Sequence, residues 1–362
     1  MKTLPSAPPP WIRKEIKASR GYPVERAPEG AIRLDAMENP FDLPPLVHQR
    51  LGEEIATLPL NRYPDGEARE LKQVLGSVLE MQEDCIFLGN GSDEILLNIF
   101  LSTPGPILLA EPTFSMYRVL AQIADRKVIG FPMSLDFTLD MRKFIDAAVS
   151  ESPSLIVLSH PNNPTGVGLN LKDVQGLCES FSGGILIDEA YYPFSRDTLL
   201  PLQKDFPNLM ILRTLSKLGL AGLRLGILSA DPSIVQELNK VRLPYNMDAV
   251  TQKAALVICK EFFPLLLEQT GWIIRLRETF LADLKRIPGV VPIPSRTNFF
   301  LVRLTNANPS IVQSLLLDEK ILVRDVSGHH PLLSGCLRVT VGKKEENALF
   351  LSALERILKG FL

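Results

Sequence analysis

The sequence has 362 residues, and its 46% hydrophobic and 22% charged residues are a balance typical of globular proteins of roughly two domains. Lys and Arg number 39 against 41 Asp and Glu, so no basic field indicates a nucleic-acid partner. The four cysteines are scattered without a CxxC pair, and no stretch approaches the roughly 20 apolar residues of a membrane span, so neither a metal site nor a membrane protein is indicated.

The N-terminal part of the chain is rich in proline and charge. Residues 1–40 show no strong period and predict an extended arm, and residues 1–20 lack the apolar region of a secretory signal. We therefore expect a cytoplasmic protein. The stretch "EARELKQVLGSVLE" has helical spacing. We assign residues 41–84, together with residues 255–362, to a small α+β domain.

From Cys85 onward, short apolar runs alternate with amphipathic stretches. The runs are "CIFLG", "PILLA", "KVIGFP", "SLIVLSHP", "GILIDEA", "LMILRTLS" and "RLGILSA". Helical patterns such as "SDEILLNIFLS" and "LKDVQGLCES" separate the first of them. This alternation predicts an α/β fold, with a mostly parallel seven-stranded sheet between helices, in a large domain over residues 85–254.

The remaining segment has a different pattern. Residues 249–287 predict helices, and three further strand-like runs follow, "TNFFLVRL", "ILVRD" and "CLRVTV". Helices are predicted near "SIVQSLLLDE" and at the closing "KKEENALFLSALERILKG". These elements make up the smaller α+β domain.

Polar clusters follow four of the predicted strands, at the edge of an open α/β sheet where ligands bind. In "GNGSDE", glycines and a helix N-terminus suit an anion, although Ser92 or Asp93 also suits a plain helix cap. "SHPNNPTG" is a rigid turn that can fix an Asn amide, or a simple loop. In "ILIDEAYYPF", Asp188 and Glu189 end a buried strand. A carboxylate at such a place needs a partner, so it can belong to a salt bridge, to a metal site or to a functional site.

The fourth cluster is "RTLSK", which ends at Lys217. A desolvated lysine close to cationic Arg224 has a lowered pKa, and such an amine forms Schiff bases with carbonyl groups. Thr214, Ser216 and Arg224 can grip a phosphate, whereas the plain alternative for Lys217 is a surface lysine. Taken together, the four clusters match what pyridoxal phosphate needs from a protein.

These residues resemble a known family. "GNGSDE", "PNNPTG", "DEAY" and "TLSK…GLR" occur in the order found in the fold-type I pyridoxal-phosphate aminotransferases. Within that family, "LDAMENP", "NRYPDG", "EPTFSMY", "ILVRD" and "CLRVTVG" are most similar to the histidinol-phosphate aminotransferase subgroup. The resemblance covers the chain from about Leu34. It implies transamination between L-histidinol phosphate and 2-oxoglutarate in histidine biosynthesis, by a homodimer.

The resemblance also implies roles for single residues. Lys217 matches the catalytic lysine, Asp188 the partner of the pyridinium nitrogen, and Asn163 and Tyr191 the partners of the phenolic oxygen. Phe114 matches the aromatic residue that stacks on the cofactor ring. The implied phosphate site consists of Gly91, Ser92, Asp93, Thr214, Ser216 and Arg224, joined by Tyr63 from the neighbouring subunit.

On the substrate side, Arg324 and Arg338 match the arginines that hold anionic groups, and Tyr22 and Asn39 match further substrate contacts. Met37 departs from the family pattern, because relatives usually have Asn in "NENP". Three alternatives remain for the function: an aminotransferase for aromatic or other amino acids, a threonine-phosphate decarboxylase, and a non-catalytic protein that keeps the fold.

Overall fold

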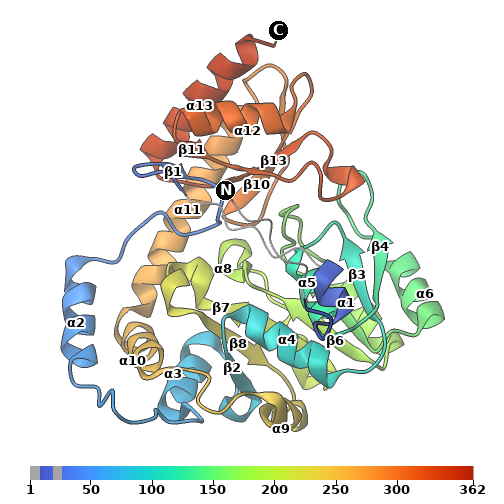
Figure 1. Cartoon of the computed structure of the whole chain (residues 1–362), viewed down its shortest axis with the longest axis vertical. Coiled ribbons are helices and arrows are strands. Elements are labelled where there is room, and N and C mark those ends of the chain that lie inside the picture. Colours follow the sequence, from blue (N-terminus) through green and yellow to red (C-terminus); the bar gives the residue numbers. More distant parts are fainter. Residues whose placement is uncertain (1–8, 19–26, 362) are drawn as a thin grey trace.

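The computed structural model describes residues 9–18 and 27–361, and its centre is a seven-stranded sheet (Figure 1). The strands are β2 (Ile86–Asn90), β3 (Ile107–Glu111), β4 (Val128–Pro132), β5 (Leu155–Ser159), β6 (Gly184–Asp188), β7 (Leu209–Thr214) and β8 (Leu225–Ser229). Their order across the sheet is β2-β8-β7-β6-β5-β3-β4, in which β8 is antiparallel to both neighbours and the other pairs are parallel. The predicted fold class is confirmed.

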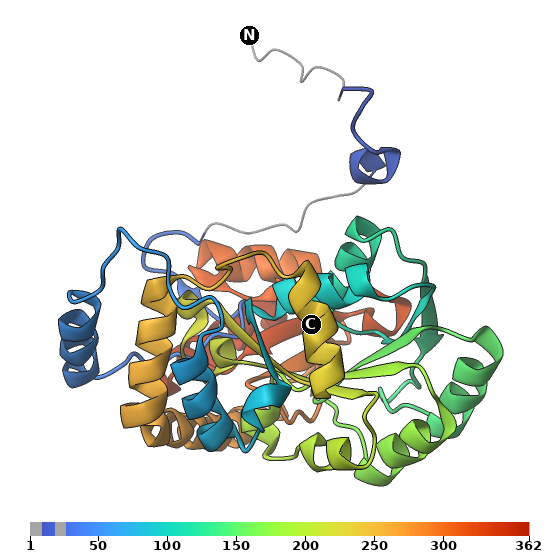
Figure 2. The same ribbon diagram turned by 90° about the horizontal axis from the view of Figure 1, so that it is seen from below.

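Successive side chains of a strand point to opposite faces of a sheet. Hydrophobic residues occupy both sets of positions in this sheet, so helices cover both of its faces. On β3, Ile107 and Leu109 pack with α4 (Ser92–Ser102), α5 (Met116–Ile123) and α9 (Pro232–Val241). Leu108 and Ala110 face the opposite layer, which contains α6 (Met141–Glu151) and α7 (Leu171–Ser180). Figure 2 shows helices on both sides of the sheet.

Residues 41–84 pack differently from our expectation. They form α2 (Pro45–Ile55) and α3 (Arg69–Leu79), and α3 buries Leu71 and Leu75 in one cluster with β2, β8 and α10 (Ala249–Val257). This segment therefore lies against the large sheet and not with the small domain, because leucines spaced four residues apart share the face of α3 that meets it. The remaining domain boundaries stay predictions.

The C-terminal segment forms the predicted α+β unit. Its four-stranded sheet has the order β12-β13-β10-β9, and β1 pairs in parallel with β11. The strands are β1 (Ile32–Arg33), β9 (Val290–Pro292), β10 (Phe299–Leu304), β11 (Ile321–Leu322), β12 (Arg324–Asp325) and β13 (Cys336–Thr340). The helices α11 (Phe263–Leu284), α12 (Pro309–Asp318) and α13 (Lys344–Lys359) complete it. Figure 1 shows α11 running from the large sheet into this unit.

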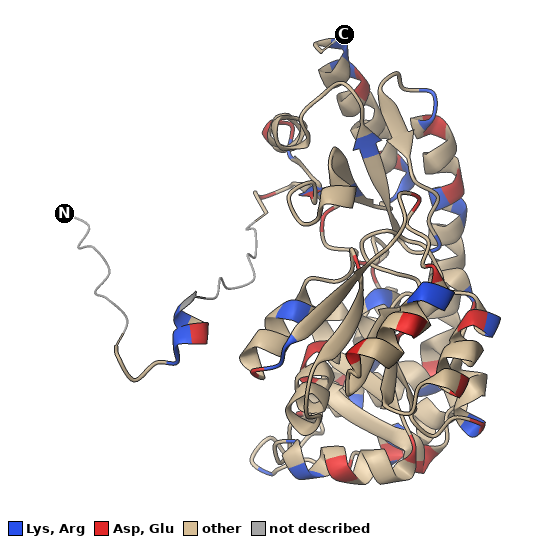
Figure 3. Ribbon diagram, turned by 90° about the vertical axis from the view of Figure 1, so that its right-hand side faces the viewer, with Lys and Arg blue, Asp and Glu red and all other residues tan. Residues whose placement is uncertain are grey.

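Shorter elements connect these parts. They are the helix α8 (Tyr192–Ser195), a π-helical turn (Ile258–Phe262) and 3-10 turns at Glu83–Cys85, Leu200–Lys204, Leu215–Leu218, Ala221–Leu223 and Pro331–Leu333. In the residues that the structure describes, no helix is long and apolar enough to cross a membrane. Basic and acidic segments are interspersed over both parts in the view of Figure 3.

The N-terminal arm is not extended throughout. It contains the short helix α1 (Lys14–Ala18), whose neighbour Arg13 donates hydrogen bonds to the carbonyls of Gln122 and Ile123. The side chain of Gln122 donates in turn to the carbonyl of Glu15 at 3.1 Å. These polar contacts hold α1 at the end of α5, and the proline-free stretch Lys14–Ala18 permits the helical turn.

Candidate active site

The polar clusters of the sequence meet at one edge of the large sheet. β5, β6 and β7 all end there, because the three strands are parallel. Asp188 is the last residue of β6, and Lys217 lies in the 3-10 turn that directly follows β7. Asn163 lies in the loop after β5 and is almost fully buried. The structure therefore brings together three residues that are separated by 25 to 54 positions in the chain.

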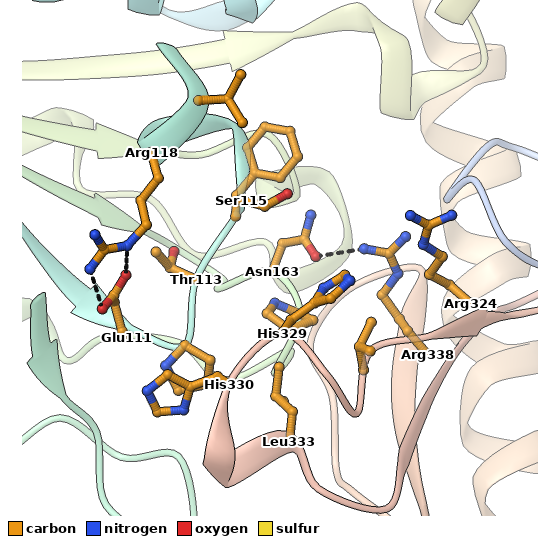
Figure 4. Close-up of a pocket in the computed structure, with 15 residues that line it drawn as sticks. Glu111, Thr113, Ser115, Arg118, Asn163, Arg324, His329, His330, Leu333 and Arg338 are labelled. Carbon is orange, nitrogen blue, oxygen red and sulfur yellow. Dashed lines mark hydrogen bonds and ion pairs between the residues drawn. The ribbon is translucent and has the colours of Figure 1, made fainter. Parts of the chain in front are cut away.

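A cavity of about 530 Å³ opens beside Asn163, between the large sheet and the small unit (Figure 4). One wall is the segment after β3, with Phe114 and Arg118, where Arg118 forms a salt bridge with Glu111. The opposite wall carries Arg324 and Arg338. These two residues are direct cross-strand partners of β12 and β13, which places both guanidinium groups on one face of the small sheet.

The environment of Lys217 favours its neutral amine. Burial lowers its pKa from 10.5 to about 8, with Arg338 as the next cause and Arg224 as a further one, while Glu38 and Asp93 act in the opposite direction. The neutral amine is the nucleophilic form of lysine, so a lowered pKa makes Lys217 reactive towards carbonyl groups near neutral pH.

Asp188 is the buried acid of the site. Burial raises the pKa of its carboxyl group to about 6, although two donors oppose this shift. These donors are neutral: the hydroxyl of Tyr117 lies 2.7 Å from Oδ2, and the backbone N–H of Ala190 lies 3.0 Å from Oδ1. A cationic ring nitrogen placed against this carboxylate would stabilise its charged form.

A chain of polar contacts crosses from the small unit to the large sheet. Nη1 of Arg338 donates to Oδ1 of Asn163 at 3.0 Å, and Nη2 donates to the carbonyl of Asp35 at 3.0 Å. Nδ2 of Asn163 lies 3.5 Å from the hydroxyl of Tyr191, whose ring centroid is 5.7 Å from the Lys217 amine. These contacts orient Asn163 and Tyr191 around Lys217.

A backbone cradle for an anion lies at the start of α4. Gly91 caps this helix with a φ of +80°, and its N–H donates to the carbonyl of Arg224 at 2.5 Å. A Cβ on Gly226 would lie only 2.5 Å from the carbonyl carbon of Gly91 and 2.7 Å from the nitrogen of Ser92. The glycines thus allow a close approach of backbone N–H groups, as a phosphate at a helix N-terminus requires.

Side chains complete this cradle. The hydroxyl of Thr214 contacts Oγ of Ser216 at 2.9 Å and the carbonyl of Leu225 at 3.0 Å. The guanidinium group of Arg224 lies against Gly91. A positive charge, two hydroxyls and a helix N-terminus therefore surround one place, with Asp188 and Lys217 at the same sheet edge. These residues fit the phosphate, ring nitrogen and aldehyde of pyridoxal phosphate.

Two predicted residues have other surroundings, and a third is not described by the structure. Tyr63 is 79% exposed and stacks on Tyr245 with the ring centroids 4.4 Å apart. The side chain of Asn39 bonds to Oε1 of Gln269 at 2.9 Å and to the carbonyl of Leu218 at 3.4 Å, which places it behind the turn that carries Lys217. Tyr22 lies outside the described residues.

Several residues of the site have no role assigned from the sequence. Tyr117 is the last residue of "EPTFSMY", and its ring packs edge to face against Phe114 with the centroids 5.5 Å apart. His329 and His330 line the cavity and are likewise not indicated by a motif. Glu189 is confirmed as a salt-bridge partner, because it contacts Arg213 at 3.0 Å inside the core.

Comparison with known proteins agrees with this geometry. The profile of the family "Aminotransferase class I and II" matches residues 29–354. The histidinol-phosphate aminotransferase of Chromobacterium violaceum is 41% identical and the match covers 95% of this chain and 97% of that protein. Histidinol-phosphate aminotransferase 1 of Burkholderia mallei is 40% identical, with 98% and 99% covered.

A solved structure shows the same fold. The histidinol-phosphate aminotransferase of Sinorhizobium meliloti, in complex with pyridoxal-5'-phosphate, superposes with a TM-score of 0.86 over 99% of this chain and 100% of that chain, at 24% identity. At that identity the likeness supports the fold, whereas the profile and the closer relatives decide the family. The chain belongs to the class I and II aminotransferases.

Proposed function

We propose that this chain transfers an amino group between L-histidinol phosphate and 2-oxoglutarate in histidine biosynthesis, with pyridoxal phosphate as its cofactor. The observation that carries the proposal is the arrangement around Lys217. Lys217, whose pKa is lowered, and the buried carboxyl of Asp188 lie at one edge of the large sheet. The small unit brings Arg338 close to Lys217 and places Arg324 beside it in the cavity wall. Relatives about 40% identical over nearly the whole chain are histidinol-phosphate aminotransferases.

Different residues of the site would bind different parts of the cofactor. The cradle at the start of α4 would hold its phosphate, and Asp188 would pair with its ring nitrogen. Asn163 and Tyr191, which contact each other, would hold its phenolic oxygen, and Phe114 from the cavity wall would supply an aromatic face for its ring. When bound in this way, pyridoxal phosphate supplies an electron sink for the charge that develops at the α-carbon of the amino donor.

The chain supplies the proton transfer and the positioning. With a pKa of about 8, half of the Lys217 amines are neutral at pH 8, and the neutral Nζ can take the proton from the α-carbon of the donor. Arg338 is held by Asn163 and by the carbonyl of Asp35, so its guanidinium group is fixed before a substrate arrives. A fixed fork of donors binds a carboxylate or a phosphate in one orientation.

The pair of arginines favours substrates that carry an anionic group besides the reacting centre. Histidinol phosphate carries a phosphate, whose double charge and three terminal oxygens can engage both guanidinium groups, and glutamate has two carboxylates. An aromatic amino acid has a single carboxylate with one negative charge, which leaves part of the positive charge of the pair without an anion. A threonine-phosphate decarboxylase would also suit two arginines, but it would release carbon dioxide and need no keto acid.

We also propose that the enzyme is a cytoplasmic homodimer with a shared active site. Leu60 and Tyr63 are 73% and 79% exposed, and Tyr63 stacks on Tyr245, which is also exposed. Apolar surface of this kind is typical of a protein interface. Across a twofold axis, Tyr63 would reach the cofactor phosphate of the partner subunit.

The proposal is tested by following glutamate formation from 2-oxoglutarate and histidinol phosphate. The purified wild-type protein is expected to form one glutamate for each donor consumed, without carbon dioxide. The Lys217→Ala variant is expected to show no turnover. Wild-type turnover in that variant, or carbon dioxide release without glutamate, would overturn the assignment.

A further inference from the structure

The position of Met37 led to a further inference, which rests on the proposed function. We propose that the Met37 thioether is a positioning group: as a weak acceptor for the Tyr191 hydroxyl, it leaves the hydroxyl proton available to the cofactor's phenolic oxygen. The hydroxyl of Tyr191 lies 3.1 Å from Sδ of Met37 and 3.5 Å from Nδ2 of Asn163.

The backbone of Met37 is held in a conformation that does not favour methionine. Its φ is +55°, in the left-handed region where Gly, Asn and Asp are preferred. Two contacts impose this conformation: the N–H of Met37 donates to Oγ1 of Thr340 at 3.0 Å, and Nδ2 of Asn298 donates to the Met37 carbonyl at 2.9 Å. The chain therefore has a methionine where the backbone conformation favours Gly, Asn or Asp.

The side chain of Met37 is packed inside the site. Its exposed fraction is 7%, and it belongs to one hydrophobic cluster with Tyr191 and Phe299. The ring of Tyr191 lies edge to face against Phe299, with the centroids 5.0 Å apart. This packing fixes the phenol, so the chemistry of the atom at position 37 acts directly on the Tyr191 hydroxyl.

The strength of the acceptor decides where the single proton of this hydroxyl goes. A thioether sulfur is a weak acceptor, and an amide oxygen is a strong one. With methionine at position 37, a charged phenolic oxygen competes successfully for the proton of Tyr191. A strong acceptor there would hold the proton, and the phenolic oxygen would lose a hydrogen bond and become more basic.

The test is a pH titration of the visible spectrum of the cofactor-loaded protein, for wild type, Met37→Gln and Met37→Leu. Gln has about the length of Met and adds a strong acceptor, whereas Leu keeps the apolar volume and has no acceptor. Met37→Gln is expected to raise the midpoint of the spectral transition by about one pH unit, because a hydrogen bond to a charged group is lost. Met37→Leu is expected to leave the midpoint unchanged or to lower it slightly.

The two variants separate this role from packing. Equal shifts in Met37→Gln and Met37→Leu, or no shift in either, would overturn the inference. Melting temperatures of the cofactor-free proteins, measured in parallel, report any loss of packing separately. If the wild-type protein shows no pH-dependent visible band, the proposed function fails. A band whose midpoint is the same in all three proteins would instead overturn only the role of Met37.

Discussion

The reactivity of Lys217 depends on a neighbouring cation. Because Arg338 lowers the pKa of Lys217, the Arg338→Gln variant is expected to raise it above about 8. Burial is the larger cause, so the pKa will stay below the ordinary 10.5. The measurement is the rate at which the cofactor-free protein takes up pyridoxal phosphate as a function of pH. The midpoint of this dependence of rate on pH should move to a higher pH in the Arg338→Gln variant. The Arg324→Gln variant is the control, in which the midpoint should stay in place.

Tyr117 tunes the acid that faces the cofactor ring. Its hydroxyl donates to Asp188 and lowers the carboxyl pKa, which burial holds at about 6. Without this donor the pKa rises, so Asp188 takes up its proton at a higher pH. As the pH is lowered, the cofactor affinity of the Tyr117→Phe variant should therefore begin to fall at a higher pH than the affinity of the wild-type protein. Tyr192→Phe, whose ring lies over Arg213, is the control, and identical pH profiles for wild type and Tyr117→Phe would contradict this role.

Individual residues of the site differ in how far the sequence predicts them. Lys217 and Asp188 each follow an apolar run within a recognisable motif, so the sequence indicates them directly. Tyr117 and Met37 act through contacts across 71 and 154 residues. Such contacts depend on how the chain folds back on itself, which local pattern does not specify.

At the level of elements, the approach of β8 to the start of α4 requires glycine. The Gly226→Ala variant would place a methyl group 2.5 to 2.7 Å from backbone atoms of Gly91 and Ser92, which cannot rotate away. Such overpacking costs about 1–3 kcal/mol, so cofactor affinity is expected to fall about 5- to 150-fold. Equilibrium binding of pyridoxal phosphate measures the effect.

The matched control is Gly176→Ala in α7, where nothing lies within 4 Å of the added methyl group. This variant should bind the cofactor like wild type and gain roughly 0.5–1 kcal/mol in the free energy of unfolding. Equal cofactor affinities in the two variants would show that the cradle does not need its close backbone approach.

The elements themselves were predicted well where periodicity is strong. All seven large-sheet strands coincide with apolar runs, because a strand buried on both faces is nearly continuous in hydrophobic residues. The assignment of α3 to the small domain was wrong, because α3 packs against the large sheet. Its leucine stripe shows that one face is buried, but amphipathic spacing does not say which sheet that face meets.

For the whole molecule, the proposed shared active site predicts complementation between two inactive variants. Lys217→Ala lacks the amine, and Tyr63→Ala lacks the side chain offered to the partner. After random mixing, half of the dimers are mixed, and each has one intact site and one doubly defective site. Turnover should therefore recover to roughly a quarter of the wild-type value. No recovery, in a mixture that native mass spectrometry shows to contain mixed dimers, would mean that each site is built from one chain.

The most direct test of the account is the visible spectrum of the purified, cofactor-loaded protein. Histidinol phosphate is added alone, and 2-oxoglutarate follows. We expect the absorbance of the lysine-bound cofactor to bleach with the donor and to return with the keto acid. An unchanged spectrum with histidinol phosphate, together with bleaching by an aromatic amino acid, would contradict the substrate assignment. Absence of a lysine-bound cofactor band would contradict the role of Lys217.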